Sequence, residues 1–177
     1  MEGNLIQNVQ NEIMLVGCLY KNTNLYVENC KMIKSKYDFS DPVTRFFYDS
    51  LDIMYTTFSQ TINESNVNVF MSQDIDRLKT YRKYGGYKTI NKWMTLSNEE
   101  DCKNYFNNVK KFSLLREYKN KEGIVDKIIK HPNFDKLNAN DIYKTVRAWA
   151  DKVSTVIMSN TDSVKMNQGN QDLVKKW

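Results

Sequence analysis

The chain has 177 residues, of which 41% are hydrophobic and 27% are charged, the balance of an ordinary globular protein. It contains no apolar run long enough to span a membrane, and its first residues lack the basic and apolar parts of a signal peptide, so we expect a cytoplasmic protein. The net charge of +5 is uneven, because residues 1–100 carry −1 and residues 101–177 carry +6. This uneven distribution of charge is compatible either with a nucleic-acid or acidic partner or with a solvated helix surface.

The sequence shows no recognisable catalytic or metal-binding pattern. Its three cysteines, Cys18, Cys30 and Cys102, and the single His131 lack the spacing of a zinc site, and buried reduced thiols are expected instead. Gly85-Gly86 does not belong to a phosphate-binding loop, because nothing resembles G-x-x-x-x-G-K-[ST]. We therefore expect no catalytic, cofactor-binding or metal-binding residue in this chain.

Helical spacing of apolar residues dominates the first hundred positions. Gly17 lies inside the first predicted helix and indicates a close approach to a neighbouring helix. Asp41 and Pro42 mark a helix start, because aspartate caps helix N-termini and proline is tolerated in the first turn. The predicted helices cover 4–20, 25–33, 42–58, 67–78 and a short stretch after the turn at Tyr84–Tyr87.

Ser97 and Glu100 have the spacing of a capping box and begin the longest predicted helix. This helix would reach Lys130 without meeting a proline, and its roughly 33 residues would extend about 50 Å. One small globule cannot bury such a length. We therefore expect one end to pack into a globular body and the other to reach a different partner.

A further helix is expected after the break at His131-Pro132, capped by Asn138 together with Asp141. Its apolar residues form a heptad seam at Ile142, Val146, Trp149, Val153 and Val156. The seam predicts an antiparallel hairpin in which about 118–130 pairs with 139–157.

A two-helix hairpin buries only one side, so its outer face should be covered by another chain. The alternative is that the same residues pack back on the body. The residues expected at a subunit or partner interface, on the hairpin and at the chain's end, are Ile128, Ile142, Tyr143, Val146, Trp149, Val153, Ile157, Leu173, Val174 and Trp177.

The predicted fold class is all-α: a small helical bundle with a protruding antiparallel helical hairpin, followed by a linker. The expected division is a globular helical body over 1–117, the hairpin over 118–158, a flexible linker over 159–170 and the start of a linker helix over 171–177. Because that last helix would have only two turns here, we expect the chain to be a fragment or an isolated domain.

Four segments occur in an order that is familiar from one protein family. They are Asn11–Leu19 with Gly17 in place, Asp38-Phe39 with Arg45–Ile53, Tyr84–Ile90, and Tyr105–Arg116. Together they resemble the N-terminal domain of DnaB-type replicative DNA helicases. The chain departs from the family at Thr44-Arg45, where a histidine is usual, and in a surface rich in Asn and Lys.

The resemblance implies a collar domain that pairs subunits into dimers, assembles them into a hexamer, and docks primase or a helicase loader in the primosome. ATP and Mg²⁺ would belong to a separate ATPase domain of the parent helicase, which would also contact single-stranded DNA. The 21 Asn and only 3 Ala suit the A/T-rich genome of a low-GC bacterium or its phage.

Two alternatives remain open. One is a free-standing helicase-loader or primase-like adaptor protein. The other is a basic helical DNA-binding protein that uses Lys103, Lys110, Lys111, Arg116 and Lys119.

Overall fold

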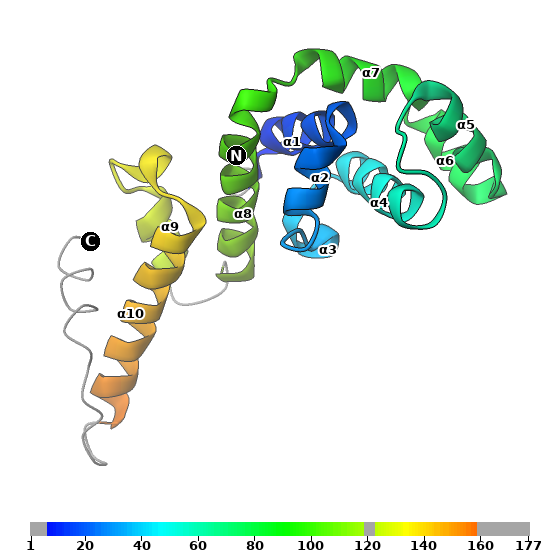
Figure 1. Cartoon of the computed structure of the whole chain (residues 1–177). Coiled ribbons are helices and arrows are strands. Elements are labelled where there is room, and N and C mark those ends of the chain that lie inside the picture. The colour runs from blue at the N-terminus through cyan, green and yellow to red at the C-terminus, as the bar shows by residue number, and fades with distance from the viewer. Residues whose placement is uncertain (1–6, 119–122, 159–177) are drawn as a thin grey trace. The chain divides into compact units, whose positions relative to one another are not determined.

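The computed structural model describes residues 7–118 and 123–158, with only the backbone described at 117–118 and 152–158. The described residues form ten α-helices and two short 3₁₀ helices without any strand, so the all-α prediction is confirmed (Figure 1). The chain divides into an N-terminal unit of residues 7–109 and a C-terminal unit that begins at Lys110. Among the described helices, none combines the length and the apolar character needed to cross a membrane.

The N-terminal unit is built around α1 (Val9–Lys21), which packs against α2, α4 and α7. Asn8 caps α1 by accepting a hydrogen bond from the Asn11 backbone N–H, so the helix begins later than the predicted residue 4. The other elements of this unit are α2 (Thr23–Asn29), α3 (Ser35–Asp38), α4 (Pro42–Thr57), α5 (Glu64–Ser72), α6 (Ile75–Lys83), α7 (Gly86–Leu96), η1 (Glu99–Asp101) and the first turns of α8 (Cys102–Tyr118).

Local polar residues set several of these helix boundaries. Asp41 caps α4 as predicted, because its carboxylate accepts from the backbone N–H groups of Val43 and Thr44 at 3.0 and 2.8 Å. The single helix predicted over 67–78 is wrong: Asp74 accepts from the Arg77 N–H at 2.7 Å and so begins α6 as a separate helix after α5.

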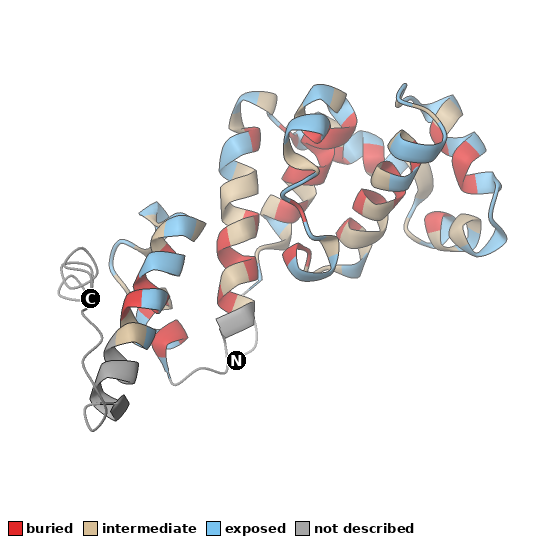
Figure 2. Ribbon diagram, turned by 60° about the horizontal axis from the view of Figure 1, so that its bottom comes forward, coloured by how far each residue is buried: buried red, intermediate tan, exposed pale blue. Residues whose placement is uncertain are grey.

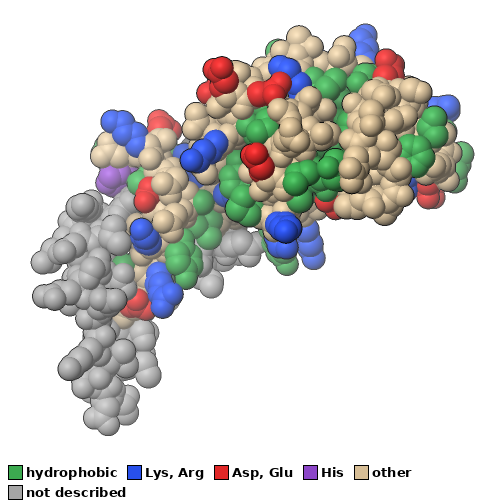
Figure 3. Space-filling view, in the orientation of Figure 1, with side chains coloured by type: hydrophobic (Ala, Val, Ile, Leu, Met, Phe, Trp, Pro, Cys, Tyr) green, Lys and Arg blue, Asp and Glu red, His purple; other side chains and the backbone are tan. Residues whose placement is uncertain are grey.

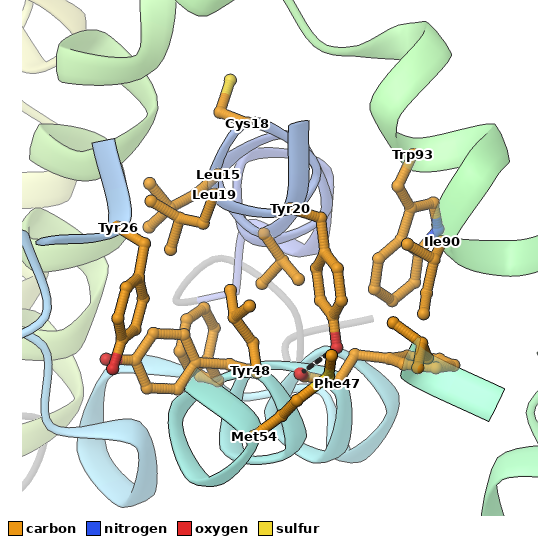
Figure 4. Packing of buried hydrophobic residues seen from close by; sticks show 14 of the residues in the cluster. Leu15, Cys18, Leu19, Tyr20, Tyr26, Phe47, Tyr48, Met54, Ile90 and Trp93 are labelled. Carbon is orange, nitrogen blue, oxygen red and sulfur yellow. Dashed lines mark hydrogen bonds between the residues drawn. The ribbon is translucent and has the colours of Figure 1, made fainter. Parts of the chain in front are cut away.

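The core of the N-terminal unit is rich in aromatic side chains from α1, α4 and α7 (Figure 4). The ring of Phe47 meets that of Trp93 edge-on, with centroids 5.1 Å apart, and the Tyr20 hydroxyl donates to the Phe47 carbonyl oxygen at 2.9 Å. Buried residues follow the inner faces of these helices (Figure 2). The core therefore joins segments that are far apart in the sequence.

Gly17 permits the close approach of α1 and α7 that its position predicted. A Cβ atom there would lie only 2.5 Å from the Trp93 carbonyl oxygen and would also collide with Ser97 Oγ. Ser97 lies in this contact, and its hydroxyl is 2.7 Å from the Trp93 carbonyl and 2.9 Å from the Met14 carbonyl. The predicted capping box is therefore wrong, since Ser97 connects α7 to α1 and Asn98 caps η1 instead.

The C-terminal unit contains the end of α8, then α9 (Ile124–Ile129), η2 (Phe134–Lys136) and α10 (Ala139–Met158). The prediction of one helix from Ser97 to Lys130 is wrong, because α8 ends at Tyr118 and α9 begins only after Gly123. Gly123 has φ +71°, a left-handed conformation that glycine adopts without steric cost and that a continuing α-helix does not use. The predicted cap of α10 is confirmed, since Asn138 Oδ1 accepts from the Asp141 N–H while Asp141 accepts from the Asn138 N–H.

An apolar cluster holds the C-terminal unit together. It joins Phe112 and Leu115 of α8 to the buried faces of α9 and α10. The seam predicted for α10 is confirmed at Ile142 and Val146, which are 0% and 4% exposed and pack with Ile128 of α9.

Candidate protein-interaction surface

The residues predicted at an interface fall into two groups in the C-terminal unit. Ile128, Ile142 and Val146 are buried inside the unit's own cluster, and Trp149 is half-buried against it. These four side chains therefore stabilise the unit internally, and their contact with a partner stays a prediction. The other predicted side chains, apart from Tyr143, lie outside the described residues: Val153, Ile157, Leu173, Val174 and Trp177.

Tyr143 lies on the exposed face of α10 that is adjacent to the buried seam. Its side chain is 43% exposed, and its hydroxyl oxygen accepts a hydrogen bond from Arg147 Nη1 at 3.2 Å. This bond raises the pKa of the Arg147 guanidinium, which stays charged at any ordinary pH. Lys144 and Arg147 are exposed beside the ring. Tyrosine and arginine are the side chains that most often carry the binding energy of protein interfaces, so this face is the best candidate for a protein contact.

The helix α10 exposes Tyr143 for a simple geometric reason. Successive residues of an α-helix are about 100° apart, so positions 143 and 147 lie one turn apart on one face, while 142 and 146 lie on the next. The local sequence puts aliphatic residues at the second pair and polar or amphipathic residues at the first. We call the exposed face, made of Tyr143, Lys144 and Arg147, the α10 outer face.

The basic residues expected to contact DNA do not form one exposed row along α8. Lys103 is exposed, but Lys111 is only 3% exposed and cannot reach a phosphate without rearrangement. Lys110 and Arg116 are partly buried, and Lys119 lies outside the described residues. On the face drawn in Figure 3, lysine and arginine side chains are interspersed with acidic ones.

Lys111 lies among aromatic rings, which the sequence pattern did not predict. Its Nζ atom lies 4.5 Å from the centroid of the Phe134 ring and 5.5 Å from that of Phe112. Burial lowers the pKa of the Lys111 amine, while the charge of Asp135 acts in the opposite direction. The lysine is part of the cluster that attaches η2 to α8, and its role is internal.

Glu12 is a second residue whose role the sequence analysis missed. Its side chain is 1% exposed, and its carboxylate accepts hydrogen bonds from the Ser40 N–H at 2.8 Å, the Asp41 N–H at 3.0 Å and the Thr44 hydroxyl at 2.9 Å. The Ser40 hydroxyl donates to the same carboxylate. Glu12 thus connects α1 to the start of α4. The sequence feature that indicates this role is an isolated acidic residue at helical spacing from Val9 and Val16, on the face of α1 that packs against the core.

The N-terminal unit also exposes large apolar side chains, including Val27, Met32, Tyr37 and Ile75. Single exposed apolar residues are normal on protein surfaces, and these lie on α2, α3 and α6 and in the turn after α2. They provide matched controls for substitutions of buried or interface residues.

No cluster of three or more His, Cys, Asp or Glu residues that could hold a metal ion occurs in the described part of the chain. Its three cysteines are free thiols, with Cys18 and Cys102 buried and Cys30 partly buried. Comparison of the chain with protein families, with curated proteins and with solved structures found no match in any of the three.

Proposed function

We propose that this chain is the N-terminal assembly and docking domain of a DnaB-type replicative DNA helicase. The observation that carries the proposal is the order of its four family-like segments, which lie on α1, on α3 and α4, at the start of α7, and on α8. Most of their apolar residues are core positions, such as Leu15, Phe47, Ile90 and Val109. The resemblance therefore concerns the residues that specify the fold, and this supports a shared architecture.

The departure at Thr44 is compatible with the proposal. Thr44 is fully buried, and its hydroxyl donates to Glu12, where the resembled family has a histidine that can also donate a hydrogen bond. Arg45 donates from Nη2 to the Phe39 carbonyl oxygen at 2.7 Å and so holds the α3–α4 connection. A donor is thus retained at this position, as expected for a diverged member of the family.

In this proposal the C-terminal unit carries the contacts between subunits and with primase or a loader. The α10 outer face supports this role because it combines an exposed tyrosine with two basic residues. ATP and Mg²⁺ would be bound by a separate domain of the helicase, so adding nucleotide to this chain should not change its melting temperature.

The first test is the mass of the chain in solution, measured by light scattering over a range of concentrations. We expect self-association that Tyr143→Glu abolishes, because the charge falls on the exposed face and leaves the buried cluster intact. Tyr37→Glu is the matched control, since Tyr37 is 51% exposed in the N-terminal unit and its substitution should leave the association unchanged. Trp149→Glu is less informative, because Trp149 also packs against the cluster.

A monomeric wild-type chain at high concentration, or a Tyr143→Glu variant that associates like the wild type, would contradict the assigned surface. Binding of the helicase-binding domain of primase is then measured by calorimetry for the wild-type chain and for the Tyr143→Glu and Tyr37→Glu variants.

The size of the native protein, detected with an antibody raised against the chain, distinguishes a helicase from a free-standing adaptor. A native protein large enough to hold a second domain supports the helicase.

The DNA-binding alternative predicts a different property of the same purified chain, a salt-dependent affinity for DNA. If Lys103 and its neighbours contacted phosphates, affinity for single-stranded DNA would fall with salt at a log–log slope of about −0.7 for each phosphate contacted. The burial of Lys111 removes one of the five basic residues on which this alternative depends.

A further inference from the structure

The charges of the N-terminal unit are separated along the chain. Residues 75–92, which form α6, the glycine turn and most of α7, carry six Lys or Arg and one Asp, a net charge of +5. The remaining residues of 7–109 carry six Lys or Arg and eleven Asp or Glu, a net charge of −5. In this unit α6 lies at the end away from the start of α8 (Figure 1). The unit is therefore neutral as a whole, with an excess of positive charge on one pair of helices.

The positive side chains of this pair gather at the turn between α6 and α7. Arg82 and Lys83 end α6, and Lys88 lies in the first turn of α7. Within the described part of the chain, the ion pair made by these cations is that of Lys79 with Asp76 at 3.4 Å, and both of its side chains are exposed. We define the α6–α7 basic corner as the five exposed cations Lys79, Arg82, Lys83, Lys88 and Lys92.

Helix stability accounts for only part of this arrangement. Arg82 and Lys83 lie in the last turn of α6, where cations are favourable. Lys88 instead lies near the N-terminus of α7, which favours anions, and no acidic residue occupies that first turn. Lys79 and Lys83 are four residues apart on one helix, as Lys88 and Lys92 are on the other, so each pair places like charges on one helix face. An external polyanion would remove this repulsion.

Two tyrosines lie within the basic corner, on either side of the glycine turn. Tyr84 and Tyr87 are both partly exposed, and Lys83 Nζ lies 5.7 Å from the centroid of the Tyr84 ring. Burial and the charge of Glu64 on α5 raise the pKa of the Tyr87 hydroxyl, which therefore stays protonated and able to donate a hydrogen bond. Unpaired bases stack on aromatic rings while lysine and arginine contact phosphates. This combination favours a single strand over an acidic peptide, whose carboxylates would use the cations alone.

We propose that the α6–α7 basic corner binds single-stranded nucleic acid, with its cations on phosphates and Tyr84 and Tyr87 against unpaired bases. This surface uses none of the basic residues of α8. The proposal does not depend on the helicase assignment, because it rests on the charge and the exposure of the N-terminal unit alone and applies equally to a free-standing adaptor.

The test measures binding of a fluorescent oligothymidylate of about twelve nucleotides to the whole chain by anisotropy. We expect an affinity that falls with salt at a log–log slope of about −0.7 for each phosphate contacted. The triple variant Arg82→Gln, Lys83→Gln, Lys88→Gln should bind about tenfold more weakly or worse at low salt, with a slope shallower by about 2. An abasic oligonucleotide of equal length should bind the wild-type chain about fivefold more weakly, because it offers phosphates without bases.

A second triple variant, Lys31→Gln, Lys34→Gln, Lys36→Gln, is the matched control. It removes the same charge from exposed positions on α3 and just before it, and should bind the oligonucleotide like the wild-type chain. All six substitutions lie at exposed positions, so both variants should fold, and circular dichroism checks this.

Four results would overturn the proposal. The wild-type chain would fail to bind the oligonucleotide at low salt. The first triple variant would retain full affinity, which would place the contact elsewhere, such as on α8. Both triple variants would lose affinity equally, which would indicate attraction by overall charge. Polyglutamate would bind the corner as tightly as the oligonucleotide and displace it, which would assign the surface to an acidic protein. None of these results bears on the helicase assignment, which is tested by self-association and by the size of the native protein.

Discussion

The two units are stabilised in different ways. The described part of the N-terminal unit buries a cluster of twenty residues, rich in aromatic rings, that joins α1, α4 and α7 across long sequence distances. In the described part of the C-terminal unit, seven buried residues form the cluster, mostly aliphatic and all drawn from Phe112 to Val146. A smaller cluster of buried apolar side chains contributes less to stability than a larger one.

Buried polar contacts show the same difference. In the N-terminal unit, Glu12 and Ser97 form hydrogen bonds with backbone groups of distant segments. Because hydrogen bonds are directional, they fix the positions of α4 and α7 relative to α1 in addition to the apolar packing. In the C-terminal unit, the contacts of Lys111 with two rings are less directional, and the buried Thr145 hydroxyl donates to the Asp141 carbonyl oxygen of the same helix. A unit with a small described cluster is well suited to gain stability from a partner.

The largest expected effect comes from removing the buried carboxylate of the N-terminal unit. Glu12→Ala leaves the backbone N–H groups of Ser40 and Asp41 without their acceptor, and should lower the free energy of unfolding by about 3–5 kcal/mol. Urea denaturation measures this loss. Glu28→Ala is the control, because Glu28 is exposed on α2 and its removal should change stability by no more than about 0.5 kcal/mol. Similar losses in both variants would refute the structural role of Glu12.

A truncation in the smaller core tests whether the two units differ in stability. Ile128→Ala removes a fully buried side chain of α9 and should cost about 3 kcal/mol. Hydrogen exchange should show faster exchange in α9 and α10, with α1 and α4 still protected. Ile75→Ala, at a position that is 64% exposed, is the matched control and should have little effect. Equal loss of protection in both units after Ile128→Ala would mean that they unfold as one.

High pH should act mainly on the N-terminal unit through its buried tyrosines. Burial raises the pKa of Tyr20 and raises that of Tyr81 to about 12. Since the unfolded tyrosine ionises near its ordinary pKa of about 10, the unfolded chain loses protons first, and stability should fall as pH rises above that value. Tyr20→Phe should reduce this loss by about 1 kcal/mol per pH unit, as measured by urea denaturation at successive pH values. An unchanged pH slope would contradict burial of the Tyr20 hydroxyl.

The smallest expected effects come from matched helix caps in the two units. Asp41→Ala removes the cap of α4, Asn138→Ala removes that of α10, and each should cost about 1 kcal/mol. Because the C-terminal unit has less stability to lose, the second substitution should increase hydrogen exchange more than the first. Equal changes in exchange would argue against a difference in stability between the units.

Sequence pattern predicted features that depend on neighbours along the chain. The all-α class, the Asp41 cap, the Asn138 cap and the seam at Ile142 and Val146 all follow from local spacing, and the structure confirms them. Gly17 also indicated a close helix approach, because a glycine within an apolar helix has few other uses.

Features that depend on distant acceptors could not be predicted in the same way. Ser97 has the spacing of a cap, but its hydroxyl lies against carbonyl groups of α7 and α1, and only the folded chain brings these together. The break before α9 depends on the left-handed conformation of Gly123. The sequence alone does not predict this conformation, because glycine also occurs inside helices. The burial of Lys111 likewise requires knowing where Phe134 lies.

The placement of two tryptophans gives each unit its own optical reporter. Trp93 is 6% exposed in the aromatic core, and Trp149 lies half-buried beside the aliphatic cluster. The indole of Trp93 should therefore emit at shorter wavelength than that of Trp149. With Trp177 replaced by Phe, variants that keep one of these two indoles would follow each unit by its own fluorescence.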